Sequence, residues 1–85
     1  MTDLKQALRT ALVAQFRVDP GSIDDNAGLF SSGLMDSLSV MDLVCFVEQE
    51  IDRIVPPSEI TLENFDSINR IARFAEKLTS VEGSR

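Results

Sequence analysis

The sequence contains no histidine, tryptophan or tyrosine, and its single cysteine is Cys45. The missing histidine excludes Ser-His-Asp and Cys-His catalysis and also histidine-ligated zinc. A lone cysteine has no partner for an intramolecular disulfide, which fits an intracellular compartment. Because no His or Lys lies near Cys45 in the sequence to activate its thiol, we expect an ordinary cysteine on a helix surface. The residue inventory thus predicts no catalytic residue and no metal site.

Long apolar runs are also missing. Near the N-terminus the longest run covers only residues 11–14, which is too short for a signal peptide or a membrane span. We therefore expect a cytoplasmic protein without direct membrane insertion. Basic side chains are scarce, with 8 Lys and Arg against 14 Asp and Glu and a net charge of −6. Since affinity for nucleic acid comes from Lys and Arg displacing counterions, nucleic acid is not an expected partner.

The 85 residues, 44% of them hydrophobic, predict one domain over residues 1–85. A domain of this size buries one thin core and leaves no second lobe for a deep enzyme cleft, so we do not expect an enzyme. No oligomer signal is present, and a monomer is expected. Residues 19–52 carry eight acids and no Lys or Arg, a charge of −8 against +2 for the rest. This segment is either a solvated surface or a face that steers basic partners.

Apolar spacing and helix breakers predict an all-α fold, a small four-helix bundle of three main helices and one short third helix. The expected elements are a helix over residues about 3–17, a long loop over 19–36, a helix over about 37–52, a short helix over about 59–65 and a last helix over about 67–79. The long loop is expected to be ordered and packed, because it contains four apolar anchors, Ile23, Leu29, Phe30 and Leu34. Residues 53–57 are expected to be extended, because each proline biases its predecessor away from helix.

Polar residues before the helices are candidate N-caps. Either Asp36 or Ser37 is expected to cap the second helix, and either Asp66 or Ser67 the last one. Thr61 is the candidate for the short helix.

The predicted second helix has two apolar stripes. At ~100° per residue, one stripe is the expected core face, and it contains Val40, Leu43, Val44, Val47 and Ile51. Leu38, Met41 and Cys45 fall on the opposite side. A surface helix needs only one apolar stripe, so the second stripe is expected to contact a partner.

The start of this helix carries a motif, Gly33-Leu34-Met35-Asp36-Ser37-Leu38. Placed after a long anchored loop and before an acidic helix, it resembles the attachment motif of the acyl and peptidyl carrier protein superfamily. The resemblance covers nearly the whole chain. It implies a covalent 4′-phosphopantetheine arm on Ser37, installed from coenzyme A by a separate Mg-dependent phosphopantetheinyl transferase. It also implies that Asp36 helps this transferase recognise the site or its metal.

The residue chemistry suits this role independently. A hydroxyl at a helix N-terminus is exposed, and a phosphodiester formed there meets free N–H groups and the favourable end of the helix dipole. Ser37 as a simple N-cap is the alternative use of such a serine. The neighbouring serines, Ser31, Ser32 and Ser39, lack the Asp-Ser-Leu setting.

The region before the last helix, with Pro57-Ser58-Glu59-Ile60, Phe65-Asp66-Ser67 and Ile71, is similar to that of D-alanyl carrier proteins and other stand-alone aminoacyl carriers. The similarity implies an amino acid or short acyl group held as a thioester, loaded by an adenylating ligase and passed to a downstream acyltransferase. The expected partner-binding residues are Leu38, Met41, Cys45, Asp42 and Glu48. Two alternatives stay open: a fatty-acyl or polyketide acyl carrier, and a four-helix adaptor that is never pantetheinylated.

Overall fold

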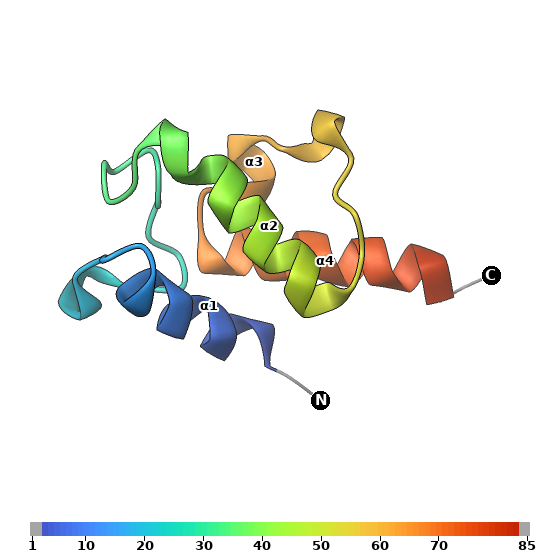
Figure 1. Cartoon of the computed structure of the whole chain (residues 1–85), viewed down its shortest axis with the longest axis horizontal. Helices are drawn as coiled ribbons and strands as arrows, with labels where there is room; N and C mark the ends of the chain where they lie inside the picture. The colour runs from blue at the N-terminus through green and yellow to red at the C-terminus, as the bar shows by residue number, and fades with distance from the viewer. Residues whose placement is uncertain (1–2, 84–85) are drawn as a thin grey trace.

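The computed structural model describes residues 3–83, with side chains through residue 79. Within this range the chain is helical and has no strand. Its α-helices are α1 (Leu4–Ala14), α2 (Val40–Ile51), α3 (Leu62–Phe65) and α4 (Ile68–Gly83), shown in Figure 1. Three short 3-10 turns lie between them, η1 (Pro20–Ser22), η2 (Ser37–Ser39) and η3 (Pro57–Glu59). The all-α prediction, with three main helices and a short third one, is confirmed.

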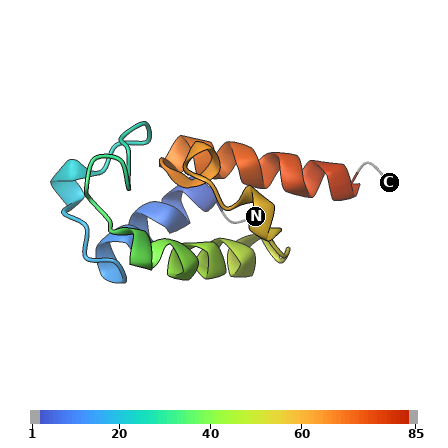
Figure 2. The same cartoon turned by 90° about the horizontal axis from the view of Figure 1, so that it is seen from above.

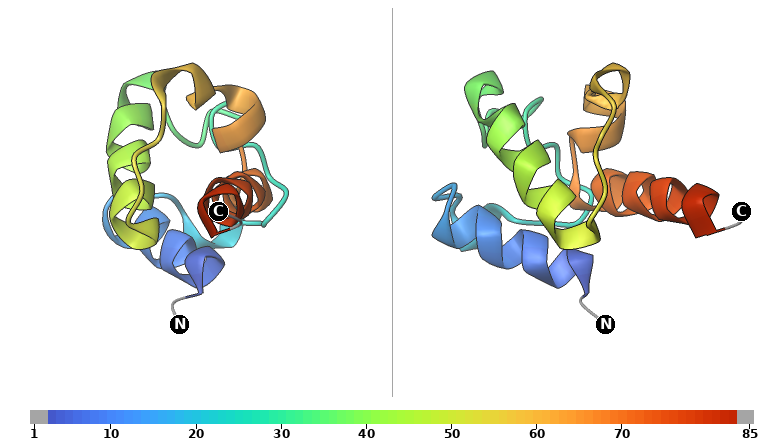
Figure 3. Two further views of the ribbon diagram at one scale, coloured as in Figure 1. Left: turned by 90° about the vertical axis from the view of Figure 1, so that its right-hand side faces the viewer. Right: turned by 45° about the vertical axis from the view of Figure 1, so that its right-hand side comes forward.

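The long loop between α1 and α2 lies at one end of the molecule, and the last turns of α4 extend from the other end (Figures 1 and 2). Viewed along the bundle, the four helices surround a common centre (Figure 3, left). α4 packs against each of the other helices. Among the described residues, no helix is long and apolar enough to cross a membrane.

α1 begins where the Asp3 carboxylate accepts a hydrogen bond from the Lys5 N–H at 3.2 Å. The helix ends at Ala14, three residues before the predicted end near residue 17. The reason is a turn in which Arg17 adopts a left-handed φ of 59° and the Val18 N–H donates to the Leu12 carbonyl at 2.8 Å. This turn returns Val18 to the core, where it is only 4% exposed.

The loop over residues 19–36 is ordered, as its apolar residues predicted. Leu29 is fully buried, and the other apolar anchors are partly buried against the core. Polar contacts hold the first half of the loop: Arg9 on α1 makes a two-pronged ion pair with Asp25, with both N–O distances at 2.8 Å. The Asn69 N–H at the start of α4 donates to the Asp25 carbonyl at 2.9 Å. One residue thus ties the loop to two helices.

The chain between α2 and α4 differs from the prediction. The expected single short helix over about 59–65 is instead two turns, because η3 ends at Glu59 and α3 starts only at Leu62. Residues 53–56 are extended as predicted, but Pro57 is the first residue of η3, a position where the missing proline N–H costs no helical hydrogen bond. Thr61 caps α3, accepting from the Asn64 N–H at 3.3 Å.

α4 begins one residue later than expected and extends beyond residue 79 to Gly83. Of its two candidate caps, the Ser67 hydroxyl is the one used, accepting from the Arg70 N–H at 3.1 Å. Ile68 and Ile71 are fully buried. Phe74 is also buried and packs against Phe65 in a tilted arrangement with ring centres 5.6 Å apart.

Candidate functional site

Ser37 is the first residue of η2, the turn that leads into α2. Its side chain is exposed and makes no side-chain hydrogen bond with the part of the chain that the structure describes. The helical conformation predicted from residue 37 is therefore present, but as a 3-10 turn that becomes α-helix at Val40. The hydroxyl stands at the tip of the element, where another enzyme can reach it.

Asp36, and not Ser37, is the cap. Its Oδ1 accepts from the Ser39 N–H at 3.1 Å and from the Ser39 hydroxyl at 3.2 Å. The N–H group of Ser39, which was expected to be free to bind a phosphodiester, therefore already donates to the Asp36 carboxylate. Because capping is done by the neighbouring residue, the Ser37 hydroxyl is left for other chemistry.

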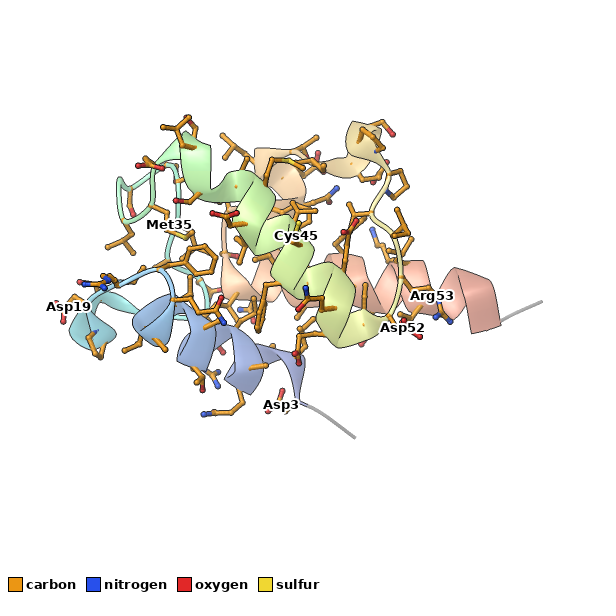
Figure 4. All side chains as sticks on the ribbon, viewed as in Figure 1. Asp3, Asp19, Met35, Cys45, Asp52 and Arg53 are labelled. Atoms are coloured by element: carbon orange, nitrogen blue, oxygen red, sulfur yellow. The ribbon has the colours of Figure 1, made fainter. Side chains whose placement is uncertain are left out.

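Two residues before Asp36 and Ser37 hold this turn in place. Gly33 has a φ of +87°, a left-handed conformation that favours glycine and lets the chain reverse. Met35 is only 6% exposed, and its N–H donates to the Leu29 carbonyl at 2.8 Å. Figure 4 shows Met35 at the loop end of the molecule, beside the start of α2. Sequence reasoning overlooked Met35 as an anchor, although an apolar residue between Gly33 and the exposed Asp36 was a usable signal.

A small cavity of about 200 Å³ lies beside Ser37. Its lining comes from the loop, the start of α2 and the α3 region, namely Phe30, Ser37, Val40, Ile60, Thr61, Leu62 and Phe65. The walls are mostly apolar, with two hydroxyl-bearing residues at Ser37 and Thr61. The site therefore combines a reachable hydroxyl with an adjacent apolar surface.

The predicted partner stripe, which runs from η2 into α2, faces outward. Leu38 is 87% exposed, Met41 is 53% exposed and Cys45 is exposed, while Leu43, Val44 and Val47 are buried. Figure 4 shows Cys45 midway along α2. The opposite-face geometry of the two stripes is confirmed, whereas contact with a partner stays a prediction.

The two acidic residues predicted to bind partners have different surroundings. Asp42 is exposed on α2. Glu48 is half-buried, and its carboxylate accepts from the buried Val55 N–H at 2.8 Å. Four residues later, Asp52 is the C-cap of α2 with a left-handed φ of 56°, and the Arg53 guanidinium donates to the Asp52 carbonyl at 2.9 Å (Figure 4). Glu48 thus fastens the segment after α2 to the helix.

Two exposed apolar side chains near this surface were not predicted. Ile54, in the segment after α2, is 78% exposed, and Leu62 on α3 is 57% exposed. Leu62 also lines the cavity beside Ser37. Their signal was weak, because an isolated apolar residue in a short turn has no periodicity from which its exposure can be read.

Asp66 has a role that its sequence position did not reveal. Its carboxylate accepts from the Phe30 N–H at 2.8 Å, the Ser31 N–H at 3.0 Å and the Ser31 hydroxyl at 2.7 Å. Partial burial by itself would raise the pKa of this carboxyl, but the hydrogen bonds from Ser31 and Phe30, with the nearby positive charge of Arg70, outweigh it. The pKa of Asp66 therefore lies below its ordinary value, and the group is ionised at neutral pH.

No group of three or more Cys, Asp or Glu side chains in residues 3–79 is arranged to hold a metal ion. Asp25, one of the acids in the segment 19–52, is neutralised by Arg9. The exposed chemistry of the site is therefore the hydroxyl of Ser37, the apolar surface around it and the exposed acids Asp42 and Glu50 on α2.

Comparison with known proteins places this arrangement in context. Residues 6–75 match the PP-binding domain family, described as a phosphopantetheine attachment site. The chain is also similar to the D-alanyl carrier protein of Lactobacillus acidophilus, with 34% identity over 56 residues that cover 66% of this chain and 68% of that protein. The matched residues include the whole of the site described above.

Proposed function

The chain belongs to the phosphopantetheine-attachment family of carrier proteins, and on this basis we propose that it holds an amino acid or another small carboxylic acid as a thioester on an arm attached to Ser37. Membership implies a covalently attached 4′-phosphopantetheine and a protein that carries substrates between enzymes. The attachment residue, the cargo and the partner enzymes belong to the proposal.

The observation that carries the proposal is that the Ser37 hydroxyl is exposed and does not serve as the N-cap of the turn that leads into α2. A transferase needs a hydroxyl that it can reach without unfolding the chain, and Ser37 stands at the tip of η2. Ser39 is a poorer acceptor, since its hydroxyl already donates to Asp36 and its side chain is half-buried. When bound, the arm supplies a terminal thiol for the thioester, and the protein supplies its position.

A small cargo is supported by two independent observations. The relative from Lactobacillus acidophilus is named a D-alanyl carrier protein. The cavity beside Ser37, at about 200 Å³, is smaller than the roughly 300–1,000 Å³ typical of sites for drug-sized ligands. A tethered amino acid needs no deep pocket, because the arm itself raises its effective concentration at each partner site.

The partners in this proposal are a phosphopantetheinyl transferase, an adenylating ligase and a downstream acyltransferase. The exposed stripe of Leu38, Met41 and Cys45 lies directly after the attachment serine and supplies an apolar centre for docking. Asp42 lies beside this stripe and supplies charge at its rim, where it orients a basic partner surface. Glu48 adds negative charge from the same helix. One of its carboxylate oxygens accepts from the Val55 N–H, and the other is the one offered to a partner.

The first experiment tests the attachment. The purified chain is incubated with coenzyme A and a broad-specificity phosphopantetheinyl transferase, and its intact mass is measured. We expect one added arm on the wild type and on Ser39→Ala, and none on Ser37→Ala. Circular dichroism of Ser37→Ala should show an unchanged helical spectrum, so that loss of the arm is not loss of the fold. An arm mapped to any other serine would contradict the proposal.

The second experiment tests the cargo. The arm-bearing protein is offered to a set of adenylating ligases that act on amino acids, short acids or fatty acids, with ATP and a panel of these acids. We expect loading of an amino acid or short acid. Loading of medium or long fatty acids alone would instead establish a fatty-acyl carrier. The apolar lining of the cavity is compatible with such a chain.

A further inference from the structure

The loop in front of Ser37 is fastened to one distant residue, Asp66. Three consecutive loop residues donate to it: Leu29 to its carbonyl at 2.5 Å, Phe30 to Oδ1 at 2.8 Å, and Ser31 to both carboxylate oxygens at 3.0 and 2.7 Å. We name this set of hydrogen bonds the Asp66 latch. A charged acceptor that receives several hydrogen bonds makes stronger contacts than a neutral one.

The side chains of the latch leave no room for a Cβ at Gly28. A Cβ built on Gly28 would overlap the Ser31 hydroxyl and would lie 3.2 Å from the Asp66 Oδ2 atom. The Ser32 hydroxyl donates to the Gly28 carbonyl and tightens the same turn. The loop is thus drawn against Asp66 along residues 28–31 and has one close-fitting position there.

The latch joins two walls of the cavity beside Ser37. Phe30, whose N–H enters the latch, lines the cavity from the loop. Phe65, the residue directly before Asp66, lines it from α3 together with Leu62. Because one residue is bonded to the loop wall and is covalently next to the helix wall, it sets the distance between them.

We propose that Asp66 is a positioning residue that keeps the cavity beside Ser37 small, so that a long acyl chain on the arm stays in solvent while a small cargo is unaffected. This inference rests on the proposed function, since only an arm on Ser37 brings a cargo to the cavity. Asp66 would then decide whether a long acyl chain can enter the cavity.

The chain offers a matched control in Asp25, which also anchors the loop through a carboxylate. Its partners are Arg9 on α1 and, through its carbonyl, Asn69 on α4. None of these three residues lines the cavity beside Ser37. Asp25→Ala therefore removes a loop anchor of similar chemistry without moving the cavity walls.

The test uses the arm-bearing protein carrying either an acetyl or an octanoyl group, installed by the transferase from the corresponding acyl-coenzyme A. Cleavage of each thioester by hydroxylamine is followed by intact mass. In the wild type both thioesters should be cleaved at similar rates after correction for their small-molecule rates. In Asp66→Ala the octanoyl thioester should be cleaved at least about twofold more slowly than the acetyl one, because only the unshielded fraction reacts.

Three further variants separate positioning from general stabilisation. Asp66→Asn retains one acceptor oxygen for the Phe30 and Ser31 N–H groups and the bulk of the side chain, and should keep the wild-type ratio of the two rates. Asp25→Ala should leave the ratio at its wild-type value even if its melting temperature falls. If Asp66→Ala does not fold, Ser31→Ala decides, since it removes a single hydrogen bond and should shift the ratio in the same direction.

A wild-type protein that already shields octanoyl would overturn the proposal. So would an Asp66→Ala protein, or in its place a Ser31→Ala protein, that melts earlier but keeps the wild-type ratio. A chain that acquires no arm would show no mass increase before any cleavage step, and this result would overturn the proposed function together with the inference. The two failures are therefore distinguishable.

Discussion

The two apolar faces of α2 carry similar side chains but have opposite surroundings. On the inner face Leu43 and Val47 have no exposed surface. On the outer face Met41 is 53% exposed, and Leu38 in the preceding turn η2 is 87% exposed. Burial of a residue of this size contributes roughly 1.5–3 kcal/mol to folding, a contribution that the outer face does not make. The comparison teaches that one face of the helix stabilises the core while the apolar side chains of the other face stay exposed.

The sharpest way to break this comparison is to place the same charge on each face. Val47→Glu buries an unpaired carboxylate in the core and should cost on the order of 3–5 kcal/mol in the free energy of unfolding. Met41→Glu, six positions earlier on the outer face, should change it by no more than about 0.5 kcal/mol. Urea denaturation followed by circular dichroism measures both. Equal losses would show that the outer face is also part of the core.

The converse prediction concerns partner transfer. Leu38→Glu should weaken transfer from the adenylating ligase by about 30-fold, the effect of removing an apolar contact worth about 2 kcal/mol. Its unfolding midpoint should stay at the wild-type value. Loading rates measured at a range of protein concentrations separate weaker docking from slower chemistry. Unchanged loading would move the docking surface away from this face.

Glu48 lies between the two faces of α2, and its replacement should cause a loss of stability between those of Val47→Glu and Met41→Glu. Glu48→Ala leaves the buried Val55 N–H without its acceptor and should cost about 1–2 kcal/mol in stability. Glu48→Gln keeps an acceptor oxygen and should lose much less. Thermal melts of the two variants, with Glu50→Ala as an exposed acidic control, check this. A larger loss in Glu48→Gln than in Glu48→Ala would contradict the hydrogen-bond explanation.

The smallest expected effect is the acid dependence of the loop beside the outer face. The pKa of Asp66 is lowered in the folded chain, so its contribution to stability is present above its ordinary value of 3.8 and is lost as the pH falls through the folded value. Asp66→Asn should therefore be less stable than the wild type at neutral pH, and the difference should shrink in acid. Urea midpoints across this range measure it. A difference that grows in acid would have the wrong sign.

Much of the fold followed from the sequence because its signals are local. The stripe of Leu43, Val44 and Val47 recurs at helical spacing, and the structure buries all three. Cap chemistry was readable to within one residue, but the choice between neighbours was not. Ser67 is the cap of α4 because the Asp66 carboxylate is occupied by Phe30 and Ser31, which lie far away in sequence.

The ends of elements were less accessible for the same reason. α1 stops at Ala14 because the following turn buries Val18, and burial of one residue depends on the whole core. The predicted short third helix divides into η3 and α3, where Ile60 and Thr61 leave the helical conformation. The sequence of this region has Pro56 and Pro57 at its start and Thr61, a good N-cap, in its middle. It permits either one short helix or two separate turns.

By itself the sequence determined the helical class, the Asp-Ser-Leu motif at Ser37 and the two-sided character of α2, because composition, spacing and capping chemistry act over a few residues. Only the tertiary structure decided which carboxylate latches the loop, how small the cavity beside Ser37 is, and that Glu48 fastens the chain to α2 while Asp42 stays exposed. These outcomes depend on contacts between residues up to 37 positions apart in the sequence, as between Leu29 and Asp66. Such contacts form only when the core has brought those segments together, so no local pattern records them.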